Sequence, residues 1–304
     1  MKRLRERADV LAQVRRFFDA RGYLEVQTPI AVPSPGLDLH LDAFEVAGGE
    51  RGAPRWLITS PEYQMKRLLA DGWERIYQTV ACFRRGEAGE RHNPEFTMLE
   101  WYCAHQGVEA VMRDTEQLVA SVTGGTVRLG SRAIDVRPPL ERMTVCAAFE
   151  RFAGWSEEAT LHAAALDEGR YFRALVEDVE PRLAALDHGI FLVDYPASQA
   201  SLARRKPADP RLAERFELYV AGVELCNGFG ELVDPVEQRA RMEADQGARR
   251  VRGLPVYPID ERFLEALARV PPCAGNALGL DRLVALTCGT TAIGDGMAFA
   301  ADDL

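Results

Sequence analysis

The sequence lacks the apolar run of about 18 or more residues that a membrane-spanning helix requires. Its N-terminal stretch, MKRLRERADVLAQVRRFF, is basic, but it has neither an apolar core segment nor a small-residue cleavage site. A secretory signal needs both of these features. We therefore expect no membrane association and no export.

Paired cysteines are also missing. The six cysteines are scattered and none forms a CxxC pair: Cys82, Cys103, Cys146, Cys226, Cys273 and Cys288. Disulfide frameworks and structural zinc sites show regular cysteine spacings. The cysteine pattern favours reduced thiols and a cytoplasmic location.

Lysine is scarce, at positions 2, 66 and 206 alone, and the formal net charge is −9 with a pI near 5.3. Non-specific nucleic-acid binding depends on basic patches that displace counterions from phosphates. The acidic balance therefore argues against a broad nucleic-acid-binding surface, although it leaves room for a local basic groove.

Hydrophobic periodicity and turn residues predict interleaved helices and strands without the regular alternation of a parallel sheet. Ser60 is expected to cap a helix whose first residue is Pro61. We predict an α+β fold, with a mostly antiparallel sheet flanked by helices, in one domain over residues 1–304. Helices are expected at 2–20, 61–71, 107–122, 163–186, 234–252 and 280–289, and strands at 22–32, 55–60, 76–84, 95–102, 126–136, 190–196, 216–234 and 275–279.

The stretch RRGEAGERHNPEFTMLEWY, residues 84–102, places many charges between two apolar runs. If these runs form a hairpin, Arg84 stands near the end of one strand and Phe96 returns on the other. An arginine fork can bind two phosphate oxygens, and a ring face can receive a nucleobase. A salt-bridged hairpin tip above a core phenylalanine is an equally good reading of this segment alone.

The C-terminal stretch GNALGLDRLVAL, residues 275–286, has small residues before a predicted helix that carries Arg282. Glycines at 275 and 279 let a flat ligand approach the backbone, and Arg282 offers a second phosphate fork. Taken alone, this spacing is more often a packing pattern than a binding pattern.

In VELCNGFGELVD, Glu224 and Glu231 flank Asn227. Two carboxylates beside a triphosphate are suitable Mg²⁺ ligands. Their odd spacing puts them on opposite faces of a regular strand, so we expect a bulge at Gly228 or Gly230 to bring them together. Two exposed glutamates on an edge strand are the alternative.

Together these segments resemble the three ordered motifs of class II aminoacyl-tRNA synthetases. GYLEVQTPI is similar to motif 1, the arginine–hairpin–phenylalanine segment to motif 2, and LGLDRLV to motif 3. RHNPEFTMLEWY and VELCNGFGELVD are most similar to lysyl-tRNA synthetases. The resemblance covers nearly the whole chain and implies the class II fold, adenylate chemistry and, through motif 1, a homodimer.

Lysyl-tRNA synthetases carry an anticodon-binding β-barrel before motif 1, which needs on the order of a hundred residues. Here motif 1 begins at residue 22, so we expect no anticodon-binding domain and no stable tRNA binding. This resembles the elongation factor P–(R)-β-lysine ligase family, which is similar in having alanine where Ala277 stands. The family implies β-lysine as substrate and elongation factor P as acceptor.

The resemblance also implies roles for individual residues. Arg84 and Arg282 would be catalytic, holding the α- and γ-phosphates of ATP, and Mg²⁺ would bind Glu224 and Glu231. Further ATP contacts are implied for Arg85, Gly86, Glu87, His92, Asn93, Phe96, Glu224, Leu225 and Gly279. Substrate contacts are implied for Ser60, Pro61, Glu62, Tyr102, Asn227, Glu231 and Ala277.

One position departs from motif 2. The usual Arg-x-Glu would place glutamate at 86, but the chain has Gly86 and then Glu87, so the loop must shift by one residue to restore the carboxylate. Residues 104–200 offer no assignable chemistry.

Three other functions remain open. The first is an enzyme that charges tRNA or a free acceptor with lysine, and the second is an asparagine-synthetase-like enzyme. Glu62 and Glu231 argue against the second, because its substrate carboxylate calls for a basic pocket residue. The third is an inactive regulatory paralogue, which tends to lose ATP ligands such as Arg84, Glu224 and Arg282.

Overall fold

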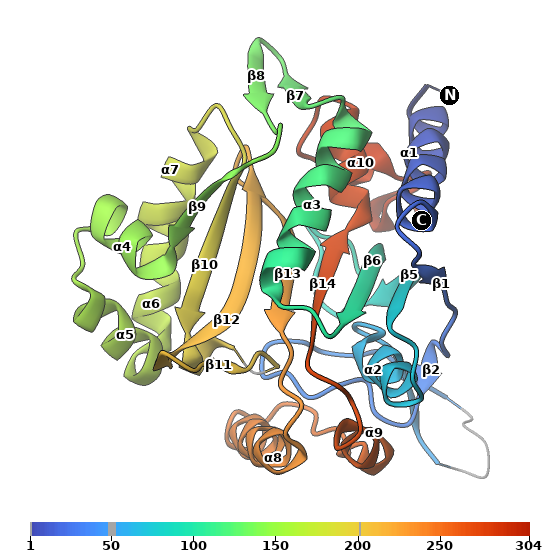
Figure 1. The fold of residues 1–304 in the computed structure, drawn as a ribbon, viewed down its shortest axis with the longest axis vertical. Coiled ribbons are helices and arrows are strands. Elements are labelled where there is room, and N and C mark those ends of the chain that lie inside the picture. The colour runs from blue at the N-terminus through green and yellow to red at the C-terminus, as the bar shows by residue number, and fades with distance from the viewer. Residues whose placement is uncertain (1, 48–52, 201) are drawn as a thin grey trace.

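A central mixed sheet organises the protein in the computed structural model, which describes residues 2–47, 53–200 and 202–304. Within these residues the sheet has nine strands in the order β1-β5-β6-β14-β13-β12-β10-β9, with β11 paired to β12 (Figure 1). The strands are β1 (Leu24–Glu25), β5 (Arg75–Phe83), β6 (Glu95–Ala104), β9 (Glu141–Thr144), β10 (Ile190–Pro196), β11 (Arg205–Lys206), β12 (Asp209–Val220), β13 (Val223–Gly230) and β14 (Cys273–Gly279). All pairs are antiparallel except β1–β5 and β9–β10.

Two smaller sheets and a set of helices surround the central sheet. The smaller sheets join β2 (Ala31–Val32), β3 (Glu45–Val46) and β4 (Arg55–Leu57), and β7 (Thr126–Leu129) with β8 (Arg132–Asp135). The α-helices are α1 (Lys2–Asp19), α2 (Glu62–Ala70), α3 (Val108–Thr123), α4 (Val145–Ala153), α5 (Glu157–Leu166), α6 (Glu168–Ala174), α7 (Glu180–Ala184), α8 (Pro235–Val251), α9 (Glu261–Leu267) and α10 (Leu280–Thr287). The predicted α+β fold with a mostly antiparallel sheet is confirmed.

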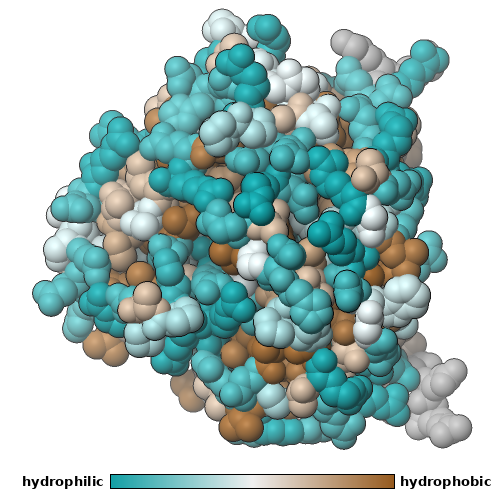
Figure 2. Space-filling model, in the orientation of Figure 1, coloured by the Kyte–Doolittle hydropathy of each residue, from teal (hydrophilic) through white to brown (hydrophobic). Residues whose placement is uncertain are grey.

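The two faces of the sheet differ in chemistry. On β6, Leu99 and Trp101 pack into the large apolar core with residues of α1, α3 and α10. Side chains alternate along a strand, so Glu100 and Tyr102 turn to the opposite face, where the charged residues of the site lie. The outer surface in the view of Figure 2 is mostly hydrophilic, with apolar residues in small groups.

Several predicted boundaries were wrong. The strand predicted over 22–32 is two short strands, β1 and β2, separated by Pro29 and its neighbours. The helix predicted over 163–186 is α5, α6, a π-helical turn (Leu175–Val179) and α7. Helix α2 begins one residue later than predicted, because Pro61 has ψ near 3° and occupies the N-cap position.

No helix in the described part of the chain is both long and apolar enough to cross a bilayer. The β5–β6 hairpin forms as predicted, with Phe83 opposite Glu95, and holds the charged loop of residues 84–94 at its tip.

A buried ion pair fixes the N-terminal helix to this hairpin. Asp281, 1% exposed, pairs with Arg7 of α1 and accepts a hydrogen bond from the Thr97 backbone N–H at 2.5 Å. Arg7 also donates to the Thr97 hydroxyl at 2.7 Å. One carboxylate therefore joins α1, β6 and α10.

We expect Asp281→Ala to lower the free energy of unfolding by roughly 2–4 kcal/mol, because it leaves a partly buried arginine without its partner. Urea denaturation measures this loss. Asp302→Ala, at an exposed C-terminal position, is the control and should change stability by no more than about 0.5 kcal/mol. Equal stability of the two variants would contradict the role given to Asp281.

Candidate active site

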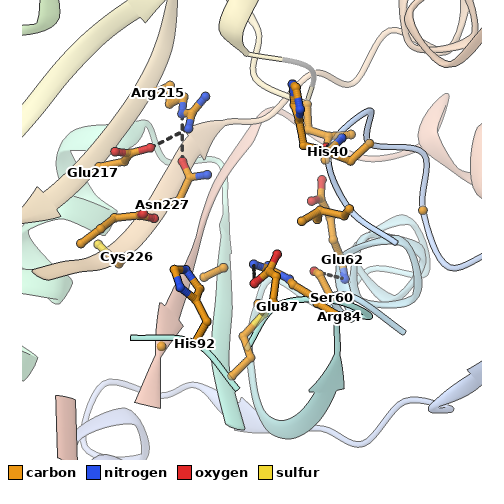
Figure 3. Close-up of a pocket in the computed structure, with 18 of the residues that line it drawn as sticks. His40, Ser60, Glu62, Arg84, Glu87, His92, Arg215, Glu217, Cys226 and Asn227 are labelled. Atoms are coloured by element: carbon orange, nitrogen blue, oxygen red, sulfur yellow. Dashed lines mark hydrogen bonds and ion pairs between the residues drawn. The ribbon is translucent and has the colours of Figure 1, made fainter. Parts of the chain in front are cut away.

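A cavity of about 580 Å³ opens on the charged face of the sheet. Its size is typical of small-molecule sites. Strands β6, β12, β13 and β14 form its floor, and the loop of residues 84–93 and the segment of residues 34–41 form two of its walls. Figure 3 shows charged side chains from these elements pointing into the same space. Of the predicted site residues, the following line it: Ser60, Glu62, Arg84, Glu87, His92, Asn93, Phe96, Glu224, Leu225, Asn227, Ala277, Gly279 and Arg282.

Arg84 lies at the end of β5, as the hairpin predicted. Its guanidinium carbon is 4.9 Å from the centre of the Phe96 ring, and its Nε donates to the Thr59 carbonyl at 3.4 Å. The cation covers a ring face. Arg84 and Phe96 thus lie side by side on the wall of the cavity.

The loop after Arg84 brings Glu87 to the cavity, one residue after the position where motif 2 would place its glutamate. Gly86 has φ of +88°, a conformation that favours glycine. The turn directs Glu87 into the cavity, where its carboxylate is 3.8 Å from the Arg84 guanidinium. Arg85, in contrast, points to Asp42 at 3.3 Å, and neither Arg85 nor Gly86 lines the cavity.

His92 and Arg282 meet at the far side of this loop. The two side-chain nitrogens are 3.0 Å apart, and Arg282 also donates to the Glu224 carbonyl at 2.7 Å. Burial lowers the pKa of His92, and the charge of Arg282 lowers it further. His92 is therefore a neutral acceptor that holds the arginine, and its implied contact with ATP stays a prediction.

Asn93 fastens the loop to the C-terminal segment. Its Nδ2 donates to the Glu95 carbonyl at 2.5 Å, and its Oδ1 accepts from the Ala301 N–H at 2.8 Å. Both ends of the amide are thus engaged within the protein.

The predicted bulge in β13 exists, but at Leu225. Tyr219 pairs with Glu224 and Leu218 with Cys226, so Leu225 is the extra residue. The extra residue makes the odd spacing between Glu224 and the residues after the bulge effectively even. Glu224 therefore lies on the same face of the sheet as Asn227, and both line the cavity. The predicted positions, Gly228 and Gly230, were wrong: they lie in regular ladder, where an added Cβ would meet other side chains.

Glu231 lies on that face but does not line the cavity. It is 1% exposed and forms an ion pair with the fully buried Lys66, which also pairs with Glu62, both at 2.5 Å. Burial opposes the charge of Lys66, but the two carboxylates outweigh it and raise the lysine pKa. This placement does not support Glu231 as a metal ligand beside Glu224.

Ser60 and Tyr102 both bond to Glu100, a residue that the sequence analysis missed. Ser60 Oγ is 2.8 Å from Glu100 Oε2, and the Tyr102 hydroxyl is 2.6 Å from Oε1. Burial, and then the charge of Glu62, raise the pKa of Glu100 to about 8. Tyr102 and Pro61 do not line the cavity.

Small residues open the floor at β14. Ala277 pairs with Glu100 and Asn227 across the strands and lines the cavity. A Cβ on Gly279 would lie 3.2 Å from Arg282 Cδ, so the glycine leaves room for that side chain.

A second charged group on β12 was also missed. Glu217 Oε2 accepts hydrogen bonds from the hydroxyls of Tyr195, at 2.5 Å, and Tyr219, at 2.8 Å, and its Oε1 accepts from Arg215 at 2.5 Å. Burial, and then the charge of Glu217, raise the pKa of Glu224, against Arg282 and Arg215. Glu217 is therefore the carboxylate that acts on Glu224. The available signal was that Arg215 and Glu217 alternate with the apolar residues Phe216 and Leu218 near the C-terminal end of β12.

Residues 104–200, to which no chemistry was assigned, supply a whole wall of the cavity. It includes Glu168, Tyr171, Phe172, Leu175, Val176, Glu180, Tyr195, Ser198 and Gln199. Their helices are short and irregular, which explains why sequence periodicity did not single them out.

Comparison with known proteins identifies the protein family. The model of tRNA synthetases class II (D, K and N) matches residues 1–303. Two relatives are named elongation factor P–(R)-β-lysine ligase. The one from Haemophilus influenzae (strain PittGG) is 38% identical, and the match covers 100% of this chain and 96% of that protein. The one from Proteus mirabilis (strain HI4320) is 42% identical, and the match covers 97% of this chain and 94% of that protein. The chain belongs to this ligase family of class II synthetases. The Salmonella dublin relative, 40% identical over 98% of this chain and 95% of its own length, carries the same name.

The raised pKa of Glu100 makes stability depend on pH. The folded protein holds the proton up to about pH 8, whereas the unfolded chain releases it near 4.5. The folded state then binds more protons between these values, so this group's contribution to stability declines as pH rises from about 5 to 8.

We expect Glu100→Gln, which mimics the protonated acid, to lessen that decline. Compared with wild type, the variant should therefore gain stability at pH 8 relative to pH 5. Melting temperatures of wild type and variant at both pH values test this. Glu265→Gln, at an exposed position of α9, is the control. If the melting temperature of Glu100→Gln changed with pH as much as that of wild type, the raised pKa of Glu100 would be refuted.

Proposed function

We propose that this protein activates (R)-β-lysine with ATP as an adenylate and transfers the lysyl group to the ε-amino group of a lysine on elongation factor P. The observation that carries the proposal is that one cavity is lined both by arginines and an aromatic ring, which suit a nucleotide, and by a carboxylate, which suits an ammonium group. We assign Arg84, Phe96 and Arg282 to a nucleotide end, and Glu62, which pairs with the fully buried Lys66, to an amine end. The names of the relatives support the choice of substrate and acceptor.

The first end suits a nucleotide. Arg84 and Arg282 supply positive forks for the phosphates, and Phe96 supplies a ring face for the base. In the first step a carboxylate oxygen of the amino acid attacks the α-phosphorus of ATP, and pyrophosphate leaves. Such a step needs positioning and charge stabilisation more than covalent help from side chains.

The second end suits a cationic chain. Glu62 lines the cavity, with Lys66 and Glu231 behind it, so the three side chains together carry one excess negative charge when ionised. An ammonium group of β-lysine balances that charge. Asparagine-synthetase-like chemistry fits less well, because its substrate carboxylate would face Glu62.

Magnesium fits the nucleotide end. Glu217 and Glu224 are adjacent carboxylates whose repulsion a divalent cation relieves. No cluster of three or more His, Cys, Asp or Glu side chains suited to a metal occurs in the described residues, so phosphate oxygens would complete the shell. When bound, Mg²⁺ would offset phosphate charge. We propose Glu217 as the partner of Glu224 in place of Glu231.

We further infer that residues 1–304 act as one catalytic unit, in the cytoplasm, as a homodimer and without stable tRNA binding. The continuous family match supports the single unit. The similarity of residues 22–30 to motif 1 supports the dimer.

We expect Arg84→Ala and Arg282→Ala each to lower β-lysine-dependent exchange of pyrophosphate into ATP by roughly a hundred- to thousandfold, as loss of a preorganised charge donor does. Melting temperatures should stay near that of wild type, because both side chains are partly exposed. Arg262→Ala, exposed on α9, is the matched control. Normal exchange in either site variant would refute its phosphate role.

A further inference from the structure

Arg215 of β12 joins two parts of the site through one guanidinium. Its Nε donates to Asn227 Oδ1 at 3.1 Å, and its Nη2 donates to Glu217 Oε1 at 2.5 Å. Its Nη1 donates to the Gln199 carbonyl. The guanidinium also stacks over the Tyr195 ring, with 4.4 Å from its carbon to the ring centre. Every nitrogen of the fork is therefore held in place.

This contact dictates the orientation of the Asn227 amide. A guanidinium only donates hydrogen bonds, so Asn227 must turn its oxygen toward Arg215. Because the amide is planar, its NH₂ group then points away from Arg215 and toward the cavity, as Figure 3 shows. Asn227 lines the cavity, and its Nδ2 has no hydrogen-bond partner among the residues that the structure describes.

The position of Asn227 indicates what this NH₂ group meets. Asn227 pairs with Glu217 on one side and Ala277 on the other. Along the chain it lies between Glu224, which lines the cavity, and Glu231, which is buried and paired with Lys66. Glu62, Glu224 and Asn227 line the same cavity, so a substrate with its ammonium group at Glu62 and its carboxylate facing ATP beside Glu224 comes near Asn227. An NH₂ donor attracts a carboxylate oxygen and repels an ammonium group.

We propose that Arg215 is a positioning residue that fixes the Asn227 amide so that its NH₂ group donates to the carboxylate of the amino-acid substrate. The bonds from Tyr195 and Tyr219 to Glu217 hold Arg215 in turn. The inference rests on the proposed function, because it requires an amino-acid carboxylate in the cavity.

A double-mutant cycle tests the coupling. The variants are Arg215→Lys, Asn227→Ala and both together, assayed by pyrophosphate exchange with separate KM values for β-lysine and ATP. Lysine keeps a positive charge beside Glu217 but lacks the planar fork. Each single variant should raise the KM for β-lysine roughly ten- to hundredfold, with a much smaller change in the KM for ATP. In the Asn227→Ala background, Arg215→Lys should add little.

Arg211→Lys is the matched control, because Arg211 lies on the same strand with its side chain 55% exposed. It should leave both KM values unchanged. Independent, multiplying effects of Arg215→Lys and Asn227→Ala would overturn the inference. So would a rise in the KM for ATP as large as that for β-lysine.

Asn227→Asp supplies a second test that does not depend on folding of the Arg215 variant. Aspartate still accepts from Arg215 but turns an oxygen toward the substrate carboxylate. Its KM for β-lysine should exceed that of Asn227→Ala, and a KM equal to wild type would overturn the inference. If the wild type shows no amino-acid-dependent exchange at all, the proposed function itself fails, which separates the two outcomes.

Discussion

The ammonium of Lys66, fully buried between Glu62 and Glu231, is the contact on which the amine end of the cavity depends. A buried carboxylate without a partner is very costly, and three acidic side chains meet here. Lys66 balances one charge, and Glu100 avoids a second by keeping its proton. The charge that remains faces the cavity on Glu62. The end is thereby stable when empty and still attracts a cation.

At the nucleotide end, too, charged side chains are offset by partners of opposite charge, but here arginines are the groups left to bind the ligand. Arg282 and Arg215 offset the carboxylates of Glu224 and Glu217, while Arg84 rests on Phe96 and near Glu87. These partners hold the arginines without saturating them. The antiparallel sheet makes both ends possible, because alternation along each strand puts charged side chains on one face and core residues on the other.

Local patterns in the sequence predicted much of this arrangement. The β5–β6 hairpin, the small residues of β14 and the need for a bulge in β13 follow from turn residues, spacing and alternation. The position of the bulge did not follow, because the glycines that suggested it serve close packing against Phe216 and Glu214 instead.

Partnerships across long sequence separations were beyond such patterns. Lys66 and Glu231 are far apart in the chain, so no local pattern indicated that the two side chains form an ion pair. The contacts of Arg215 and Glu217 depend on the pairing of β12 with β13, which no local pattern in the sequence reveals. Glu100 lies in the stretch of residues 84–102, where the charged and aromatic residues of the hairpin predicted a role for Arg84 and Phe96 but not for Glu100. The wall of residues 168–199 was predicted as a helix and a strand, but the break of that helix at the π-helical turn, which helps to decide which side chains face the cavity, has no local signal.

The most direct test of the account is the intact mass of elongation factor P after incubation with this protein, ATP, Mg²⁺ and (R)-β-lysine, beside reactions with L-lysine and with no amino acid. The account predicts a mass increase of one lysyl unit that is larger with β-lysine. No increase, with pyrophosphate exchange intact, would contradict elongation factor P as the acceptor. An increase that appears equally without amino acid would contradict lysyl transfer altogether.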